Sequence, residues 1–395
     1  MTRAEFDKFI PTHIIGVLER FKNADEESYV VGGCVRDILL GRPLNDFDIT
    51  AAALPERTAE LFSDCRIIET GIKHGTLTVI VEGEPLEITT FRIDGDYKDS
   101  RHPEQVIFTH RIEDDLARRD FTVNAMAYNP WQGLVDPFGG RDDLASRIIR
   151  AVGEPQKRFT EDALRIMRAF RFSATLGFEI EKNTLSAAQS CKKGLANIAR
   201  ERIGVEFAKL LLAPDPGPAL EKMRDGGILE YVTGGYCPDS LVLSLLAKMP
   251  ADEGARLGLF LSEADGESAK EIISGLKRSG IITKSALATI RGCKKSIEND
   301  VEARRLIALC GVYARNASVA SVLLGNSPHE AIRRVAENTA PCTLRELAIT
   351  GKDLMAAGLE GRAVGRALDA ALAAVINDPS LNEKERLIEL CLRRK

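Results

Sequence analysis

Hydrophobic positions follow one rhythm in the first part of the chain and another in the rest. Up to about residue 91, apolar and β-branched residues alternate with polar ones in short runs that end at glycine or proline, which is the pattern of strands and turns. From about residue 141 to the C-terminus, apolar residues recur almost only at helical spacing, as in EDALRIMRAFRFSATLGF. The sequence therefore predicts an α+β fold, in which a head with a small mixed sheet precedes an all-helical remainder.

This spacing also places the elements of the head. Residues 1 to about 25 carry one amphipathic pattern and predict a helix that packs on the sheet. Further helices are expected near 34–40 and 56–63. The polar stretch 94–110 lacks periodicity and predicts a long loop. The predicted strands are 29–32, 47–52, 66–69, 76–82 and 85–91.

The helical remainder is interrupted where glycine and proline gather. We find no fixed-period repeat, so a solenoid is not expected. The change of rhythm and the proline-rich break divide the chain into segments 1–146, 147–213 and 214–395. The predicted breaks lie at 214–218, 226–227, 234–235 and 377–379.

Composition limits the class of protein. With 395 residues, 44% hydrophobic and 28% charged, the chain is long enough for several globular units and does not have the composition of a disordered protein. A formal net charge of −4 argues against indiscriminate binding to nucleic acid, but local basic clusters remain available to an RNA. The eight cysteines form no CxxC pair, and we see no signal peptide and no apolar run of membrane-spanning length. We therefore expect a cytoplasmic protein with reduced thiols and no membrane contact.

Candidate chemistry is concentrated in residues 30–53, VVGGCVRDILLGRPLNDFDITAAA. A β-forming run ends at Gly32 and Gly33, and a helical pattern follows them, so the order is strand, glycine turn, helix. Glycines at such a turn let the backbone approach a ligand, and the free amides of the helix start favour an anion such as phosphate. Arg36, one turn into the helix, can add charged donors to the same phosphate.

Three acidic residues are candidates for a metal site. Asp46 and Asp48 follow the glycine turn at strand period, which puts both carboxylates on one face. They would repel each other unless a divalent cation lay between them, and Mg²⁺ prefers oxygen ligands together with substrate phosphates. Taken alone the pair fits the solvent face of an edge strand at least as well, but beside the glycine turn it predicts a magnesium site. Glu87 stands alone on one face of the strand LEITTFR and is either a surface residue or a third acidic ligand.

A second cluster of charge lies in RRDFTVNAMA at residues 118–127. Here Arg119, Asp120 and Asn124 combine a cation for phosphate, a carboxylate for ribose hydroxyls and an amide that both donates and accepts. The tripeptide RRD by itself would equally fit a helix cap with a salt bridge.

A third cluster belongs to a predicted helix that starts after Thr160 as its N-cap and carries Asp162 in its first turn. Asp162, Arg165, Arg168 and Arg171 recur at every third position, so one face presents a carboxylate and a ladder of guanidiniums. A solvated helix with an internal ion pair is the simpler interpretation. Apolar residues already give this helix a core face, however, so we expect the charged face to point into a cleft and to offer an acceptor and donors to base edges.

Together these motifs resemble the signature of the class II tRNA nucleotidyltransferases and bacterial poly(A) polymerases. The resemblance spans nearly the whole chain, and it is dense to about residue 211, loose in the middle, and recognisable again from 348. It rests on GGxVRD at 32–37, LGR at 40–42, DxD at 46–48, AALPE at 52–56, RRDFTVNAMA at 118–127 and EDALR at 161–165.

The resemblance implies an architecture and an activity. Segment 1–146 would be a nucleotidyltransferase head, 147–213 a helical neck that recognises the base, and 214–395 a helical body and tail that bind tRNA. The expected reaction is the template-independent addition of CCA to the tRNA 3′ end from CTP and ATP, with Mg²⁺ and release of pyrophosphate. Asp46, Asp48 and Glu87 would be the catalytic acids, with the metal on Asp46 and Asp48.

The resemblance also implies which residues contact the nucleotide. Arg119, Asp120 and Asn124 would serve the ribose, and Asp162 with Arg165 would act as a protein template that selects CTP and then ATP. The remaining residues would hold the triphosphate. The complete implied set is Gly32, Gly33, Arg36, Arg119, Asp120, Asn124, Asp162, Arg165, Arg168 and Arg171.

Other activities of related enzymes remain open at this point. A poly(A) polymerase, or a partial enzyme that adds only CC or only A, would share most of these motifs. GIKHGT at 71–76 resembles the CCA-adding branch more than the polymerase branch, and the intact stretch 94–110 favours full CCA addition over CC addition alone. A non-catalytic RNA-binding protein on this scaffold would require lost carboxylates, and all of them are present.

Overall fold

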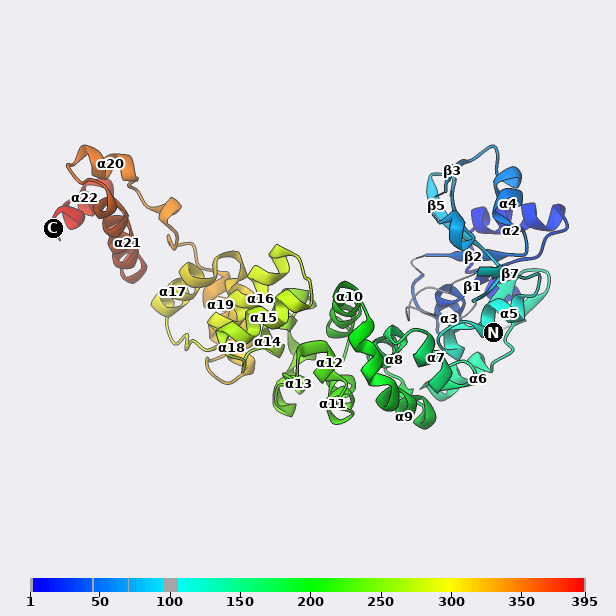
Figure 1. Cartoon of the computed structure of the whole chain (residues 1–395). Helices are drawn as coiled ribbons and strands as arrows, with labels where there is room; N and C mark the ends of the chain where they lie inside the picture. Colours follow the sequence, from blue (N-terminus) through cyan, green and yellow to red (C-terminus); the bar gives the residue numbers. More distant parts are fainter. Residues whose placement is uncertain (1–2, 45, 70, 95–105, 394–395) are drawn as a thin grey trace. The chain divides into compact units, whose positions relative to one another are not determined.

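The computed structural model describes residues 3–44, 46–69, 71–94 and 106–393. The chain forms two compact units, the first comprising Met1–Glu206 with Met223–Val232 and the second Phe207–Lys222 with Thr233–Lys395. All strands of the described residues lie in the first unit, and the described part of the second is helical (Figure 1). The predicted α+β class is confirmed. The predicted segment boundaries at 146/147 and 213/214 stay predictions.

A seven-stranded sheet forms the centre of the first unit, in the order β3-β4-β5-β2-β1-β8-β9. Only β2 and β5 run parallel and the other neighbours are antiparallel, so the expected mixed sheet is confirmed. The predicted strands all form, with ends that differ by a few residues. The strands are β1 Ser28–Val31, β2 Asp48–Ala51, β3 Arg66–Ile68, β4 Thr76–Val81, β5 Glu84–Thr90, β8 Ala127–Asn129 and β9 Gly133–Val135.

The predicted loop at 94–110 is partly wrong. Strands β6 (Arg92–Asp94) and β7 (Val106–Phe108) pair with each other at its two ends, while residues 95–105 lie outside the described residues. The short run of β-formers around Ile107 explains this pairing. Phe108 lies against Gly75, where a Cβ atom would come within 2.6 Å of the ring, so a glycine is required there.

The N-terminal helix expected over residues 1–25 is two helices, α1 (Arg3–Asp7) and α2 (Thr12–Asn23). Pro11 separates them, because proline lacks the N–H that a continuous helix needs and favours a helix start. Helix α2 packs on β1 with buried Ile14 and Val17, as predicted for an amphipathic helix. It also lies beside α4 (Pro55–Leu61), where the rings of Phe21 and Phe62 are 5.4 Å apart (Figure 1).

The first unit continues with helices and one further strand pair. Strands β10 (Ile148–Ile149) and β11 (Glu179–Ile180) pair in parallel, which corrects the expectation of an all-helical remainder. A two-residue strand is too short to show a period of two, and its partner is distant in sequence. The further helices of this unit are α3 Gly33–Leu39, α5 Ile112–Ala117, α6 Gly140–Ser146, α7 Pro155–Glu161, α8 Leu164–Leu176 and α9 Lys182–Cys191. The next three helices each have residues assigned to both units: α10 Arg200–Leu211, α11 Gly217–Asp225 and α12 Leu229–Thr233.

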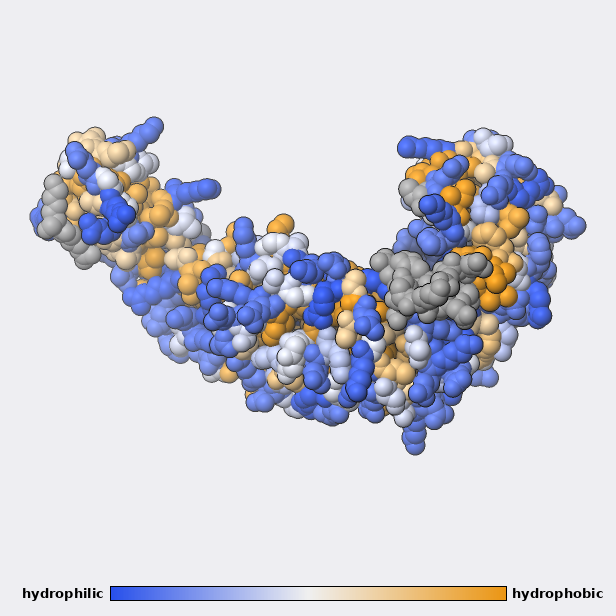
Figure 2. Space-filling model, viewed as in Figure 1, coloured by the Kyte–Doolittle hydropathy of each residue, from blue (hydrophilic) through white to orange (hydrophobic). Residues whose placement is uncertain are grey.

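The second unit is built from short helices, and the predicted breaks fall at or beside their ends. Its visible surface in Figure 2 is mostly hydrophilic, with hydrophobic residues in smaller groups. The helices are α13 Ser240–Leu245, α14 Glu253–Phe260, α15 Gly266–Gly275, α16 Gly280–Cys293, α17 Asp300–Cys310, α18 Ala314–Leu323, α19 Glu330–Ala336, α20 Gly351–Ala356, α21 Arg362–Asn377 and α22 Lys384–Leu392.

The expectation of no apolar run of membrane-spanning length is wrong by length and composition, because one stretch of the described chain, Asp300–Leu323, meets that criterion. In the structure it is not one straight helix, because α17 ends at Cys310 and is followed by Gly311, which has a φ of 57°. Its buried residues, including Leu306 and Ala317, pack with Ala288 and Val335 in one hydrophobic core. The stretch therefore supplies the interior of the helical unit.

Candidate active site

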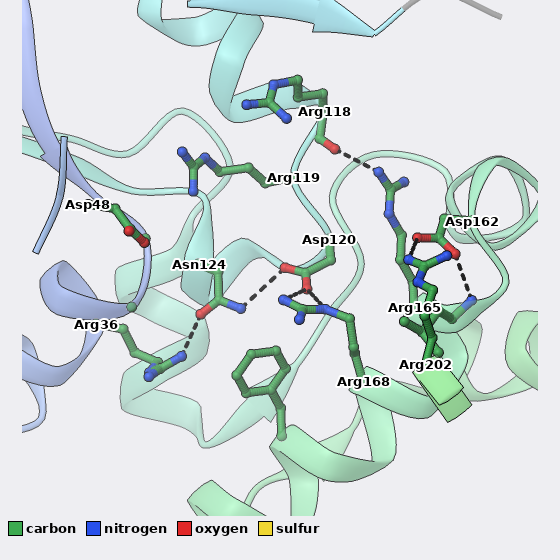
Figure 3. Close-up of a pocket in the computed structure, with 14 residues that line it drawn as sticks. Arg36, Asp48, Arg118, Arg119, Asp120, Asn124, Asp162, Arg165, Arg168 and Arg202 are labelled. Carbon is green, nitrogen blue, oxygen red and sulfur yellow. Dashed lines mark hydrogen bonds and ion pairs between the residues drawn. The ribbon is translucent and has the colours of Figure 1, made fainter. Parts of the chain in front are cut away.

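A polar cavity of about 510 Å³ lies in the first unit, where the glycine turn, the RRD segment and helix α8 meet. Figure 3 shows how its polar side chains are arranged across the cavity. Asp48 and Arg36 lie at one side, Asp120, Asn124 and Arg168 in the middle, and Asp162 and Arg202 at the other side. The described residues that line it are Gly32, Gly33, Arg36, Asp48, Arg118, Arg119, Asp120, Asn124, Asp162, Leu164, Arg165, Arg168, Phe172 and Arg202.

The glycine turn forms as predicted and leaves the backbone exposed to the cavity. Gly32 has a φ of 79°, and its amide donates to the Met126 carbonyl at 3.0 Å. A Cβ atom at Gly32 would lie 3.0 Å from Nη1 of Arg119. Because L-residues rarely adopt this conformation, a side chain here would be strained, and the Arg119 guanidinium would also have to move. Helix α3 starts directly afterwards at Gly33.

The acidic residues lie at the edge of this cavity. Asp48 opens β2, and its Cα pairs with that of Glu87 across the parallel β2–β5 ladder. Glu87 is exposed between buried Leu86 and Ile88, as the alternation predicts. Asp46 precedes the strand, so strand alternation cannot place it on one face with Asp48, and that prediction is wrong. Asp46, Asp48 and Glu87 nevertheless all line a second cavity of about 790 Å³, and Asp48 lines the first cavity as well.

The charge of Asp48 is only partly compensated by its surroundings. Burial and the neighbouring charge of Asp46 raise the pKa of Asp48, while Arg119 lowers it, and the net shift is upward. Among the described residues, Asp46, Asp48 and Glu87 accept no side-chain hydrogen bond and join no ion pair, and no group of three acidic, histidine or cysteine ligands is arranged around a common metal position.

The centre of the cavity is a hydrogen-bonded chain. Asp120 accepts from Nε of Arg168 at 2.7 Å and from Nδ2 of Asn124 at 3.2 Å. Asn124 in turn accepts from Nη1 of Arg36 at 2.7 Å. Burial by itself would raise the pKa of Asp120, but Arg168 and the Asn124 amide hold it below its usual value. These hydrogen bonds connect α3, the RRD segment and α8 (Figure 3).

Asp162 does not lie in the first turn of a helix, which corrects the prediction. Helix α7 ends at Glu161, Asp162 is extended with a φ of −141°, and α8 begins only at Leu164. Thr160 is not an N-cap, because its hydroxyl donates to the Gln156 carbonyl inside α7 at 2.8 Å. The carboxylate of Asp162 instead accepts from the Leu164 amide at 2.9 Å.

Asp162 and Arg165 both line the cavity but bind different partners. Asp162 pairs with Nη2 of Arg202 at 2.8 Å. Arg165 is 9% exposed, and it donates to Glu161 at 2.7 Å and to the Arg118 carbonyl at 3.0 Å. The expected row of one carboxylate and several guanidiniums on one helix face does not form, because these side chains bind partners from several elements.

Arg171 is the one predicted nucleotide ligand that does not line the cavity in the described part of the chain. Its Nε donates to Glu206 at 2.6 Å, and burial lowers its pKa. Conversely, Arg118, Arg202 and Phe172 line the cavity but were not predicted. Arg202 lies in the stretch ERIGVEFAKLLL, where the spacing of apolar residues predicts a helix but no site residue. Its pairing with Asp162 is a tertiary contact that this spacing does not reveal.

Comparison with known proteins agrees with this geometry. Family models match residues 28–150 (poly A polymerase head domain), 177–235 (RNA- and SrmB-binding site of polymerase A) and 255–391 (tRNA nucleotidyltransferase domain 2). The chain is 37% identical over 391 residues to a CCA-adding enzyme of Geobacillus stearothermophilus, covering 96% of each chain. It is 48% identical over 229 residues to one of Streptococcus gordonii, covering 58% of this chain and 56% of that one.

Solved structures give the same result. The structure of the Bacillus stearothermophilus CCA-adding enzyme in complex with CTP matches with a TM-score of 0.81 and 33% identity, covering 97% of this chain and 96% of that one. The Thermotoga maritima CCA-adding enzyme complexed with tRNA shares the fold, with a TM-score of 0.70 and 22% identity, covering 99% and 98%. The predicted family is confirmed, and the chain belongs to the family of CCA-adding enzymes.

Proposed function

We propose that the protein adds CCA to the 3′ end of tRNA, using CTP and then ATP and releasing pyrophosphate. The observation that carries this proposal is the order of groups along one cavity, from the glycine turn beside Asp48, through Asp120 and Asn124, to Asp162. This order matches the triphosphate, the ribose and the base of one nucleotide. The CTP complex of the full-length relative supports the same reading.

Asp46, Asp48 and Glu87 would hold Mg²⁺. In the described residues these carboxylates do not surround one common metal position, but they line the same second cavity with the oxygen donors that Mg²⁺ prefers, and a nearby cation would lower the raised pKa of Asp48. When bound, the ion would neutralise charge on the phosphates and favour the ionised form of the attacking hydroxyl.

The remaining steps belong to the chain's own residues. The glycine turn and Arg36 would receive the phosphates through backbone amides and a guanidinium, which position the α-phosphorus and stabilise its charge. The RNA 3′ oxygen would form the new bond to that phosphorus while the bond to the β-phosphate breaks. Both Asp120 oxygens already accept from Arg168, Asn124 and the Phe121 amide, so Asp120 would serve the ribose by holding Arg168 and Asn124 beside its hydroxyls.

Base choice would rest on Asp162 and Arg165. Each Asp162 oxygen already accepts one protein hydrogen bond, from the Leu164 amide or from Arg202, and has a further lone pair for the exocyclic amino group of cytosine or adenine. Both bases carry such a group, and uracil and guanine do not present it at that position. Arg165 would donate to the adjacent ring acceptor.

A direct test offers the purified protein a tRNA lacking CCA, with CTP and ATP separately and together, and sequences the RNA ends. We expect CC from CTP alone and CCA from both. An extended A tail would indicate a poly(A) polymerase, and products limited to CC or to A on a CC end would indicate a partial enzyme. Unchanged ends under all conditions would refute the proposal.

Two further assignments are part of this proposal. Residues 147–213 would recognise the base and 214–395 would bind tRNA, which is supported by the RNA-related family models over 177–235 and 255–391. The protein would be cytoplasmic, which is supported by its eight free cysteines.

A further inference from the structure

We propose that Phe172 is a positioning residue whose ring holds the guanidiniums of Arg36, Arg168 and Arg171 together beside the nucleotide cavity. The inference rests on the proposed function, which places Arg36 at the phosphates and Arg168 beside the ribose, while Arg171 lies behind them without lining the cavity in the described part of the chain. The Cζ atoms lie 5.4, 5.3 and 3.8 Å from the ring centroid, respectively.

The ring connects two parts of the site. Arg36 belongs to α3, directly after the glycine turn, whereas Arg168 and Arg171 belong to α8 with Phe172 itself. The side chain of Phe172 is nearly buried, at 6% exposure, yet it lines the cavity. Phe121 packs against it edge-on, with ring centroids 5.8 Å apart and planes at 77°, which fixes its orientation.

Three cations around one ring need compensation. Asp37 pairs with Arg36, Asp120 with Arg168, and Glu206 with Arg171. Even so, after burial the charge of Arg168 still contributes to the lowered pKa of Arg171. The negative face of an aromatic ring attracts cations, and the attraction grows when water is excluded. The ring thus lets three guanidiniums share a small, partly dry space.

This role predicts a specific kinetic effect. A nucleotide would meet Arg36 and Arg168 where the ring has placed them, so weakening the ring's attraction should weaken the binding of CTP and ATP by the same factor. Base choice depends on Asp162 and Arg165, and among the described residues Arg165 makes no cation–π contact with the ring. The order of C, C, A addition should therefore not change.

Fluorinated phenylalanines test this directly, because fluorine withdraws electron density from the ring face with little change of shape. Monofluoro-, difluoro- and trifluorophenylalanine are placed at position 172 of the full chain, and KM for CTP and for ATP is measured with tRNA saturating. We expect KM to rise with each fluorine, to about tenfold for the trifluoro ring, which corresponds to about 1.4 kcal/mol. KM for tRNA should stay constant.

Phe170 provides the matched control. It lies in the same helix, is fully buried, and takes part in no cation–π contact among the described residues. The same series at Phe170 should leave both nucleotide KM values unchanged. A flat series at Phe172, or an equal rise at Phe170, would overturn the inference and reduce Phe172 to core packing.

Two encoded variants complete the test. Phe172→Leu removes the ring face while keeping an apolar side chain, and Phe172→Tyr keeps the face. We expect the nucleotide KM to rise in the first and to remain within a few-fold of the wild type in the second. If the wild-type chain adds CCA and the fluorine series is flat, only this inference fails. If the wild-type chain adds no nucleotide, the proposed function fails first.

Discussion

The ion pair between Asp120 and Arg168 should stabilise the first unit measurably, and Asp120→Asn removes the charge while keeping the shape. Asp120 is 9% exposed and accepts from Arg168, Asn124 and the Phe121 amide. The asparagine would leave the guanidinium of Arg168 with Glu206, 3.9 Å away, as its nearest carboxylate. The expected result is a destabilised unit with an intact fold.

The magnitude follows from the environment of the pair. Removing one partner of a fully buried ion pair costs about 3–5 kcal/mol. Arg168 is 34% exposed and retains the weaker contact with Glu206, so solvent and that carboxylate recover part of this cost. We expect a loss of about 2 kcal/mol, since the pair is intermediate between buried and exposed ones. For a unit of this size the loss lowers the melting temperature by about 4–8 °C.

A single tryptophan makes the assay selective. Trp131 is the one tryptophan of the chain, and it belongs to the first unit, with Nζ of Lys22 4.4 Å from its ring centroid. Its fluorescence during heating or urea unfolding therefore follows that unit alone. Asp64→Asn is the matched control, because Asp64 pairs with Arg20 at the exposed surface. The control should melt like the wild type.

The pH dependence supplies the result that would refute this reasoning. Asp120 has a lowered pKa in the folded state, so its contribution to stability is present above the pKa of an unfolded aspartate, about 3.9, and is lost as the pH falls through the folded value. The difference between wild type and Asp120→Asn should be constant near neutral pH and shrink in acid. Equal melting at neutral pH, or a difference that grows in acid, would contradict the assignment.

Three further predictions concern the cavity. Asp48→Ala should abolish incorporation of labelled CTP yet leave the melting temperature unchanged, because the exposed Asp48 side chain joins no ion pair among the described residues; retained turnover would remove it from the metal site. Gly32→Ala should cost about 1–3 kcal/mol by tryptophan fluorescence and raise the nucleotide KM, since φ is 79° and Arg119 fills the space; a silent substitution would disprove the required turn. Asp162→Ala should lose base discrimination more than affinity, and Arg202→Ala should do so more weakly; ordered C, C, A addition by Asp162→Ala would refute the template role.

The sheet was predictable because its information is local. The alternation around Glu87 follows from a period of two, and the fully buried run of β1 follows from its β-forming residues before the glycine turn; both signals are present in a single sequence. Pro11 was a local signal as well, and the continuous amphipathic pattern on both sides of it hid the break. Strands β10 and β11 could not be predicted, because two residues carry no period and their pairing is a tertiary contact.

The residues of the site could be predicted from the sequence, but the hydrogen bonds and ion pairs between them could not. Gly32, Asp48, Asp120 and Asp162 all line the cavity, since the sequence motifs mark chemistry that must be close to a nucleotide. Which cation meets which carboxylate depends on tertiary packing. Asp120 meets an arginine from a helix that begins far along the chain, and no spacing rule gives that partner.

Asp162 shows how such a distant contact changes the interpretation of a motif. A continuous helix would have presented Asp162 and Arg165 on one face, close enough to neutralise each other. The break before Leu164 lets the carboxylate cap α8, and Arg202 of α10 then fixes its second oxygen. Arg165 is separately held by Glu161 and the Arg118 carbonyl. Because the Asp162 carboxylate and the Arg165 guanidinium are held by different elements, they do not bind each other. Each therefore keeps hydrogen-bonding capacity for a base.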